Sequence, residues 1–242
     1  MGNIGAFFDI DGTLYREGLI TEVFKKLIKY ELVDAMRWHN EVKPKYLKWD
    51  KRVGDYDDYL LGMIEIYKET VIGLTKNQIE FIAKQVINQK GDRVYTYTRD
   101  RLEWHKKNNH KVVAISGSPI EIVREIAKKY DINEYRGSIY VLNDEDKYTG
   151  EIIPMWDSIS KEKAIKEIAQ NHDIDLSISY AYGDTTGDFT MFKFVGYPVC
   201  INPTKELLKK ILCDDEMKDR IKIIVERKDV VYSINQDTLN FR

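Results

Sequence analysis

Short apolar runs alternate along most of the chain with longer segments in which apolar residues recur every three or four positions. The first run ends at Phe8, and further strand-like runs cover 111–115, 136–142, 178–182 and 197–201. Helices of the same region are expected at 93–109, 119–127, 160–168 and 203–212. Strands that alternate with helices through short connections predict an α/β fold with a doubly wound parallel sheet. A hairpin partner at 147–152 and an edge strand at 221–225 complete the expected sheet.

Residues 16–92 differ from this pattern because they show helical periodicity without a strand-like run. Expected helices cover 19–37, 46–53, 59–67 and 79–86, with breaks near Pro44, Gly54 and Gly73. A chain of 242 residues is long enough for one core and a substantial insert. We therefore expect a Rossmann-like core formed by 1–15 and 93–242, with an all-helical cap at 16–92.

Composition excludes several classes of partner. Lys and Arg number 38 against 40 Asp and Glu, so the chain lacks the basic field that nucleic acid selects. No apolar run approaches the roughly 20 residues of a spanning helix, so no membrane association is expected. Cys200 and Cys213 are the only cysteines, and no leader peptide is recognisable. Free thiols and a cytoplasmic location are the expectation.

The first strand delivers two carboxylates to its end, Asp9 and Asp11, followed by Gly12 and Thr13. Carboxylates held this close repel one another, and a divalent cation together with a bound phosphate removes the conflict. Taken alone, the same residues are equally consistent with a simple turn.

Two later segments suit an anion. The strand at 111–115 is followed by Ser116 and Gly117, whose small hydroxyl and backbone N–H groups are suited to bind a phosphate. A Ser-Gly turn that only caps the following helix is the commoner arrangement. Lys161 lies at the start of an expected helix, where the macrodipole disfavours a cation unless an anion is near.

A further strand ends in Gly183-Asp184, and Asp188 follows four residues later. In a parallel sheet, ligands bind outside the carboxyl ends of the strands. All four polar clusters fall at that end of the expected sheet. Independent turn motifs have no reason to gather there, so the joint pattern indicates one site.

The motifs FFDIDGTL, AISGS, the lysine of SKEKA, and GDTTGD, in this order, resemble the haloacid dehalogenase superfamily. The resemblance spans Phe7 to about Pro203 and is to subfamily IB, the phosphoserine-phosphatase-like branch with a helical C1-type cap. It implies a nucleophile at Asp9 and a general acid and base at Asp11. It implies phosphate-binding groups at Ser116, Gly117 and Lys161. Metal ligands are implied at Asp9, Asp11 (through its carbonyl oxygen) and Asp184, with Asp188 in support.

These roles describe a phosphatase that hydrolyses a small-molecule phosphomonoester, phosphoserine or a related metabolite, through an aspartyl phosphate on Asp9. An oxygen-rich site suits Mg²⁺ as the cofactor better than zinc. Two alternatives remain open: a phosphotransferase that passes the phosphoryl group to an acceptor other than water, and a non-catalytic module that binds a phosphorylated ligand. The oligomeric state is left open.

Selectivity is expected from the cap. The family pattern has a substrate-binding glutamate nine residues after the nucleophile, where this chain has Gly18, with Arg16 and Glu17 beside it. Arg16 and Glu17 are the candidate specificity residues. Further side chains that could face the pocket are Arg52, Trp38, Trp49 and Tyr56. For these aromatic residues, packing within the cap's own core is the favoured interpretation.

Overall fold

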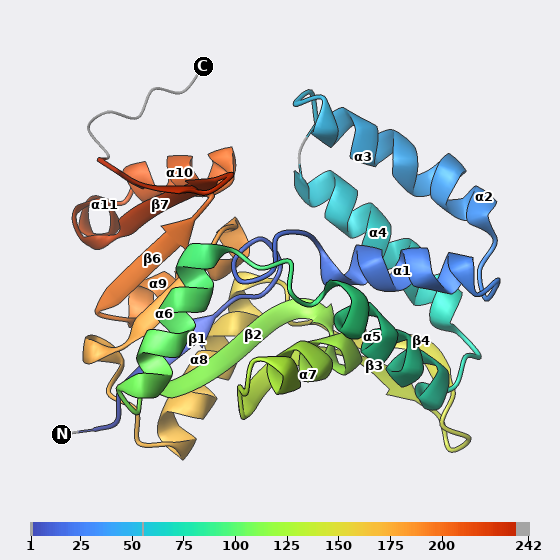
Figure 1. Cartoon of the computed structure of the whole chain (residues 1–242), viewed down its shortest axis with the longest axis horizontal. Coiled ribbons are helices and arrows are strands. Elements are labelled where there is room, and N and C mark those ends of the chain that lie inside the picture. Colours follow the sequence, from blue (N-terminus) through green and yellow to red (C-terminus); the bar gives the residue numbers. More distant parts are fainter. Residues whose placement is uncertain (1, 55, 236–242) are drawn as a thin grey trace.

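The computed structural model describes residues 2–54 and 56–235, and its centre is an eight-stranded sheet in the order β4-β3-β2-β1-β5-β6-β7-β8 (Figure 1). The strand bounds, in chain order, are β1 (Gly5–Phe8), β2 (Lys111–Pro119), β3 (Glu134–Leu142), β4 (Tyr148–Ile153), β5 (Tyr180–Gly183), β6 (Tyr197–Ile201), β7 (Lys222–Arg227) and β8 (Val230–Ile234).

The short strand β1 is the middle of this sheet. It pairs in parallel with β2 on one side and β5 on the other, with Ala6 opposite both Val112 and Tyr180. All four of its residues are buried, as expected of an apolar run covered on both faces. The pairs β2–β3, β5–β6 and β6–β7 are also parallel, whereas β4 and β8 run antiparallel to their neighbours. The predicted fold class, a mostly parallel Rossmann-like sheet with helices, is confirmed.

Helices cover both faces of the sheet, so each face has its own apolar cluster. On one face, Ala6 and Phe8 contact a cluster that includes residues of α1 (Leu19–Lys29), α5 (Lys76–Lys90), α6 (Thr96–Lys107) and α7 (Ile120–Lys129). On the other, Phe7 joins residues of α8 (Ser158–Asn171), α9 (Phe189–Phe194), α10 (Lys205–Leu212) and α11 (Asp215–Arg220). The alternation of side chains along β1 therefore divides the core into two layers.

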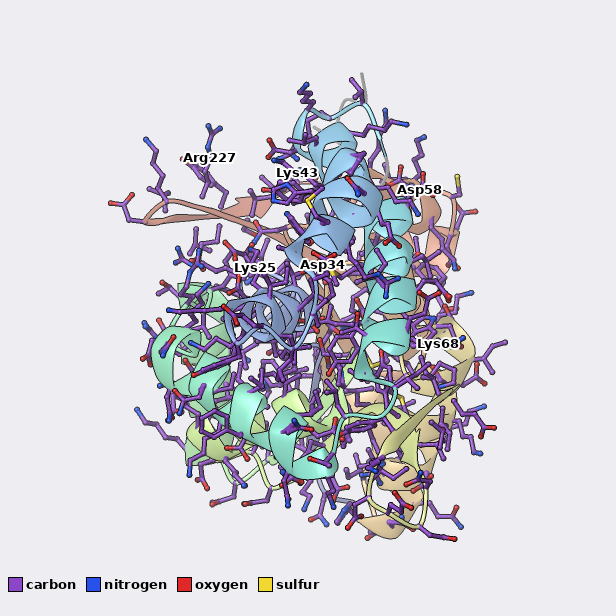
Figure 2. All side chains as sticks on the ribbon, turned by 90° about the vertical axis from the view of Figure 1, so that its right-hand side faces the viewer. Lys25, Asp34, Lys43, Asp58, Lys68 and Arg227 are labelled. Carbon is purple, nitrogen blue, oxygen red and sulfur yellow. The ribbon has the colours of Figure 1, made fainter. Side chains whose placement is uncertain are left out.

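Between β1 and β2 the chain forms helices without a strand in the described residues. After α1 come α2 (Ala35–Arg37), a π-helix (Trp38–Val42), α3 (Lys43–Asp50) and α4 (Tyr56–Val71), followed by α5 and α6. Figure 2 views the molecule from the side of these helices, with α3 beside α4 and α1 below α3.

The two connections that lead into and out of this helical segment lie side by side. The Arg16 N–H donates to the Arg93 carbonyl at 3.0 Å, and the Tyr95 N–H donates to the Leu14 carbonyl at 2.9 Å. Arg93 also forms an ion pair with Glu17. The cap boundaries predicted at 16 and 92 coincide with this paired connection, and the division into two domains stays a prediction.

Several predicted elements differ from the structure. The helix predicted over 19–37 ends at Lys29, because Glu31 takes the left-handed conformation (φ 57°) and turns the chain. The strand predicted to end at Ile115 continues to Pro119. The strand at 221–225 is not an edge, because the unpredicted β8 pairs outside it.

Both cysteines are free thiols, as predicted. Within the described residues, no helix combines the length and the apolar character that crossing a membrane requires.

Candidate active site

Side chains from four distant parts of the sequence meet beyond the carboxyl end of the central strands. Asp9 follows β1, and its N–H donates to the Tyr182 carbonyl of β5 at 2.9 Å. This bond extends the pairing of β1 with β5 by one residue, and it places Asp9 beside the loop that follows β5. Lys161 comes from the first turn of α8, whose N-cap is Asp157.

Lys161 lies between two buried carboxylates. Its Nζ atom donates to Asp9 Oδ1 at 2.6 Å and to Asp188 Oδ1 at 2.5 Å, and all three side chains are at most 6% exposed. Burial alone lowers the pKa of a lysine, but the charges of Asp188 and Asp9 raise the pKa of Lys161 above its ordinary value. The ammonium therefore stays charged and fixes the position of Asp9.

Asp188 has a full set of hydrogen bonds. While Oδ1 accepts from Lys161, Oδ2 accepts from the backbone N–H groups of Asp184 and Thr185, each at 3.0 Å. A 3₁₀ turn over Thr186–Asp188 brings the carboxylate back to these groups. This arrangement orients the loop after β5 and fits the predicted supporting role of Asp188.

Asp11 lies beside this cluster and has hydrogen-bond partners of its own. Its Oδ1 accepts from the Leu19 N–H at 2.6 Å, at the start of α1, and its Oδ2 accepts from the Ser116 hydroxyl at 2.8 Å. Ser116 Oγ in turn accepts from the Ser118 N–H at 3.0 Å. Asp11 thus links the loop after β1 to β2 and to the start of α1. Ser116 and Asp11 were predicted separately, and the structure brings them into contact.

Asp184 is held against the loop after β1. The Thr13 hydroxyl donates to Asp184 Oδ1 at 3.0 Å. Gly12 allows this approach, because its φ of +83° favours glycine and a Cβ there would lie 2.1 Å from Asp184 Oδ2. Thr13 was not assigned a site role from the sequence; the Gly-Thr step after Asp11 was its only signal.

A cavity of about 570 Å³ lies between the helical segment and the loops after β1, β5 and β6. Asp184, Gly12 and Asn202 line its core side, and aromatic residues of the π-helix, α3 and α4 line its other side. A smaller cavity of about 50 Å³ contains Asp9, Asp11 and Lys161. Gly18 and Tyr56 line both cavities, so the two are neighbours.

The predicted specificity residues lie at the rim of the larger cavity. Arg16 and Glu17 are both exposed and both line it, as does Arg52. The favoured interpretation of Trp38, Trp49 and Tyr56 as cap core is incomplete. These side chains are only partly buried and line the cavity, although they also contact other aromatic rings.

Residues 6–193 match the model of the haloacid dehalogenase-like hydrolase family. The chain belongs to this family. Because the match spans more than half of the sequence, the predicted family and the predicted enzyme class, a hydrolase, are confirmed.

Individual members of the family are distant in sequence. The inhibition of morphological differentiation protein of Streptomyces azureus is 25% identical over 209 residues, which cover 86% of this chain and 74% of that protein. A probable phosphatase of Mycobacterium tuberculosis is 32% identical over 117 residues, 48% of this chain and 40% of that protein. The solved structure of a substrate-bound phosphoserine phosphatase superposes with a TM-score of 0.62 at 18% identity, covering 95% of each chain. The fold is thus that of haloacid dehalogenase hydrolases.

The acidic residues of this hydrolase site fit a divalent cation. Asp9, Asp184 and Asp188 each place a carboxylate oxygen within 4.8 Å of the others. Since both oxygens of Asp188 already accept hydrogen bonds, Asp9 and Asp184 are the better candidates for ligands. The carboxylate of Asp11 faces Leu19 and Ser116 instead, and the metal-facing role of its carbonyl oxygen stays a prediction.

The ion pairs and pKa shifts of these carboxylates also fit a bound divalent cation. Within the described part of the chain, Asp9 and Asp188 form ion pairs with Lys161 alone, and no ion pair includes Asp11 or Asp184. Burial raises the pKa of Asp9 to about 8, against the opposing effect of Lys161. Burial also raises the pKa of Asp11, and burial together with the charge of Asp9 raises the pKa of Asp184. The site holds more buried negative charge than one lysine balances, which is the condition a bound cation relieves.

Proposed function

We propose that this haloacid dehalogenase hydrolase is a Mg²⁺-dependent phosphomonoesterase that acts on a small phosphorylated metabolite. The observation that carries the proposal is the meeting of Asp9, Asp11 and Lys161 around one small cavity at the end of β1, where the Ser116 hydroxyl donates to Asp11. The phosphatase named among the relatives and the fold shared with a phosphoserine phosphatase agree with it.

Asp9 is the proposed nucleophile. Its Oδ1 is held by Lys161, which leaves Oδ2 to attack phosphorus. The new bond between this oxygen and phosphorus forms as the bond from phosphorus to the leaving oxygen breaks, giving an aspartyl phosphate. Splitting hydrolysis into two displacements replaces one very slow step by two easier ones.

Asp11 is the proposed general acid and base. It lies at the same cavity as Asp9, on the side of Leu19 and Ser116. In its protonated form it donates a proton to the leaving oxygen. It then takes a proton from the water that attacks phosphorus, and inorganic phosphate leaves as Asp9 is restored.

The phosphoryl oxygens are expected to contact Lys161 and the segment from Ser116 to Ser118. Gly117 and Ser118 line the small cavity, and the Gly117 carbonyl is held by the Ser138 hydroxyl at 2.7 Å. Mg²⁺, held by Asp9 and Asp184 and, as the family resemblance implies, by the Asp11 carbonyl, would neutralise charge on the transferred group.

A phosphate-release assay tests the proposal. Purified protein with Mg²⁺ is given a broad panel of phosphomonoesters, and the same panel is run with excess EDTA and with the Asp9→Asn variant. We expect hydrolysis with Mg²⁺ and a loss of at least about a thousandfold in kcat with either change. Lack of phosphate release from every substrate, or full activity of Asp9→Asn, contradicts the proposal.

A further inference from the structure

The residues that line the cavity beside the phosphoryl site indicate what kind of leaving group fits there. Resting on the proposed phosphatase function, we propose that this enzyme selects phosphomonoesters whose leaving group bears a planar aromatic ring. The ring would enter the 570 Å³ cavity past Gly18 and Tyr56, the two residues that this cavity shares with the smaller one at Asp9.

The wall of the cavity is a continuous aromatic cluster. Trp49 of α3 and Tyr59 of α4 are stacked, with ring centroids 5.8 Å apart and planes 12° from parallel. Tyr46 packs edge-on against Tyr59 at 5.5 Å, and Tyr56 contacts Trp49 at 5.4 Å. Trp38 of the π-helix extends the cluster at 6.2 Å from Tyr46. All five rings line the cavity, so a ligand there meets aromatic surface along one side.

The aromatic side chains belong to neighbouring helices that pack on each other, α3 and α4, and on the π-helix between α2 and α3. Trp38, Tyr46, Trp49 and Tyr56 are each only partly buried, which leaves ring surface accessible inside the cavity. Aromatic rings prefer offset-stacked or edge-to-face contacts with other rings, and such contacts add to the gain from area burial. The cluster therefore offers a planar ligand more than an apolar surface of equal area does.

A cation of the protein, Arg52, already contacts the aromatic cluster that lines the cavity, which disfavours an ammonium group there. Glu17 is engaged by Arg93 at 2.6 Å, so it is not free to balance a cation. Arg16 and Lys25 at the same rim are likewise paired, with Glu226 and Glu22, and the carboxylates of Asp50 and Asp184 also line the cavity. Arg52 lies over the Trp49 ring, 5.3 Å from its centroid, where a cationic ligand would compete with it.

Gly18, between the two cavities, also bears on which leaving groups fit. It has an extended conformation (φ −82°, ψ 121°) that any residue adopts. A Cβ there would meet Thr21 Oγ1 at 3.4 Å and Tyr56 Oη at 3.9 Å, which are ordinary contacts. The absence of a side chain at this position is not a steric requirement of the fold. At this boundary between the two cavities Gly18 adds neither bulk nor a carboxylate, which suits a bulky uncharged leaving group.

The test compares matched substrates. Benzyl phosphate and cyclohexylmethyl phosphate are esters of primary alcohols that differ in the planarity and π-system of the ring. Phosphocholine supplies a cationic leaving group. We expect kcat/KM with Mg²⁺ to be about two- to tenfold higher for benzyl than for cyclohexylmethyl phosphate, the range typical of an aromatic contact, and lowest for phosphocholine.

Variants at Trp49 separate ring recognition from general packing. Trp49→Leu should bring the benzyl to cyclohexylmethyl ratio close to one, whereas Trp49→Phe, which keeps a ring, should retain most of it. The matched control is Phe81→Leu, an exposed aromatic residue of α5 that does not line the cavity, and it should leave the ratio unchanged.

Each result is decisive. A wild-type ratio near one, preference for phosphocholine, or an unchanged ratio in folded Trp49→Leu overturns the aromatic assignment while the phosphatase proposal stands. If Trp49→Leu does not fold, the wild-type ratio and Trp49→Phe still decide. Lack of phosphate release from all three esters and from a broad panel overturns the proposed phosphatase function, and the assignment of the leaving group with it.

Discussion

Removal of the Lys161 charge has a large expected effect that can be derived from the contacts. In Lys161→Met the side chain keeps its length but loses the ammonium that contacts Asp9 at 2.6 Å and Asp188 at 2.5 Å. Breaking a buried ion pair by removing one partner costs about 3–5 kcal/mol, because the remaining charge stays buried without compensation. Two carboxylates lose their partner here, so we expect the free energy of unfolding to fall by at least about 3 kcal/mol in metal-free buffer.

The assay is urea unfolding followed by circular dichroism, in EDTA and again in excess Mg²⁺. The matched control is Lys163→Met on the same helix, because Lys163 is exposed and forms no ion pair in the described structure. We expect this control to change stability by less than about 0.5 kcal/mol. Added Mg²⁺ should restore part of the loss in Lys161→Met, since a cation at Asp9 replaces some of the missing charge. Equal stability of the two variants in EDTA would refute the buried charge arrangement.

Further predictions concern two glycines and a buried histidine. Gly12→Ala should lower the free energy of unfolding by about 1–3 kcal/mol and displace Asp184, because residue 12 has a φ of +83° and the new Cβ would clash with the Asp184 carboxylate. Gly18→Ala should change the free energy of unfolding by less than about 0.5 kcal/mol. Urea unfolding measures both. Burial lowers the pKa of His105 from 6.5 to about 3, so the folded state keeps it neutral while the unfolded chain takes up a proton below pH 6.5. Between pH 7 and 5.5 the wild type should therefore lose about 1 kcal/mol more stability than His105→Gln, and equal losses in the two proteins would contradict the burial effect.

Much of the fold was predictable because strand and helix periods differ and the strands are short and apolar. The run that ends at Phe8 contains only buried residues, and its termination at Asp9 was visible as a change in polarity. The end of α1 was not visible, because Leu32 and Val33 continue an apolar pattern past the turn at Glu31. That turn depends on a left-handed backbone conformation in a residue type that seldom adopts it.

The residues of the site could be predicted better than their contacts. Ser116 and Asp11 are 105 positions apart in the sequence. Nothing in the sequence near either residue indicates that the Ser116 hydroxyl donates a hydrogen bond to the Asp11 carboxylate. The double role of Lys161, between Asp9 and Asp188, likewise arises only from the folded arrangement.

The aromatic residues of the cap show a different limit. Trp49 and Tyr56 have the spacing of core-facing helical positions, and hydrophobicity does not distinguish a core from a cavity wall. They pack on other rings on one side and face a cavity on the other. Such a position becomes apparent only when the volume between elements distant in sequence is known.

The central claim, that Asp9 carries the phosphoryl group, is tested most directly by rapid acid quench during turnover with Mg²⁺ and benzyl phosphate, followed by mass mapping of peptides. We expect one phosphoryl group on the peptide that contains Asp9, located at Asp9 by fragmentation, and none in Asp9→Asn. Turnover in Asp9→Asn at the wild-type rate, or a phosphoryl group on a different residue, would contradict the account.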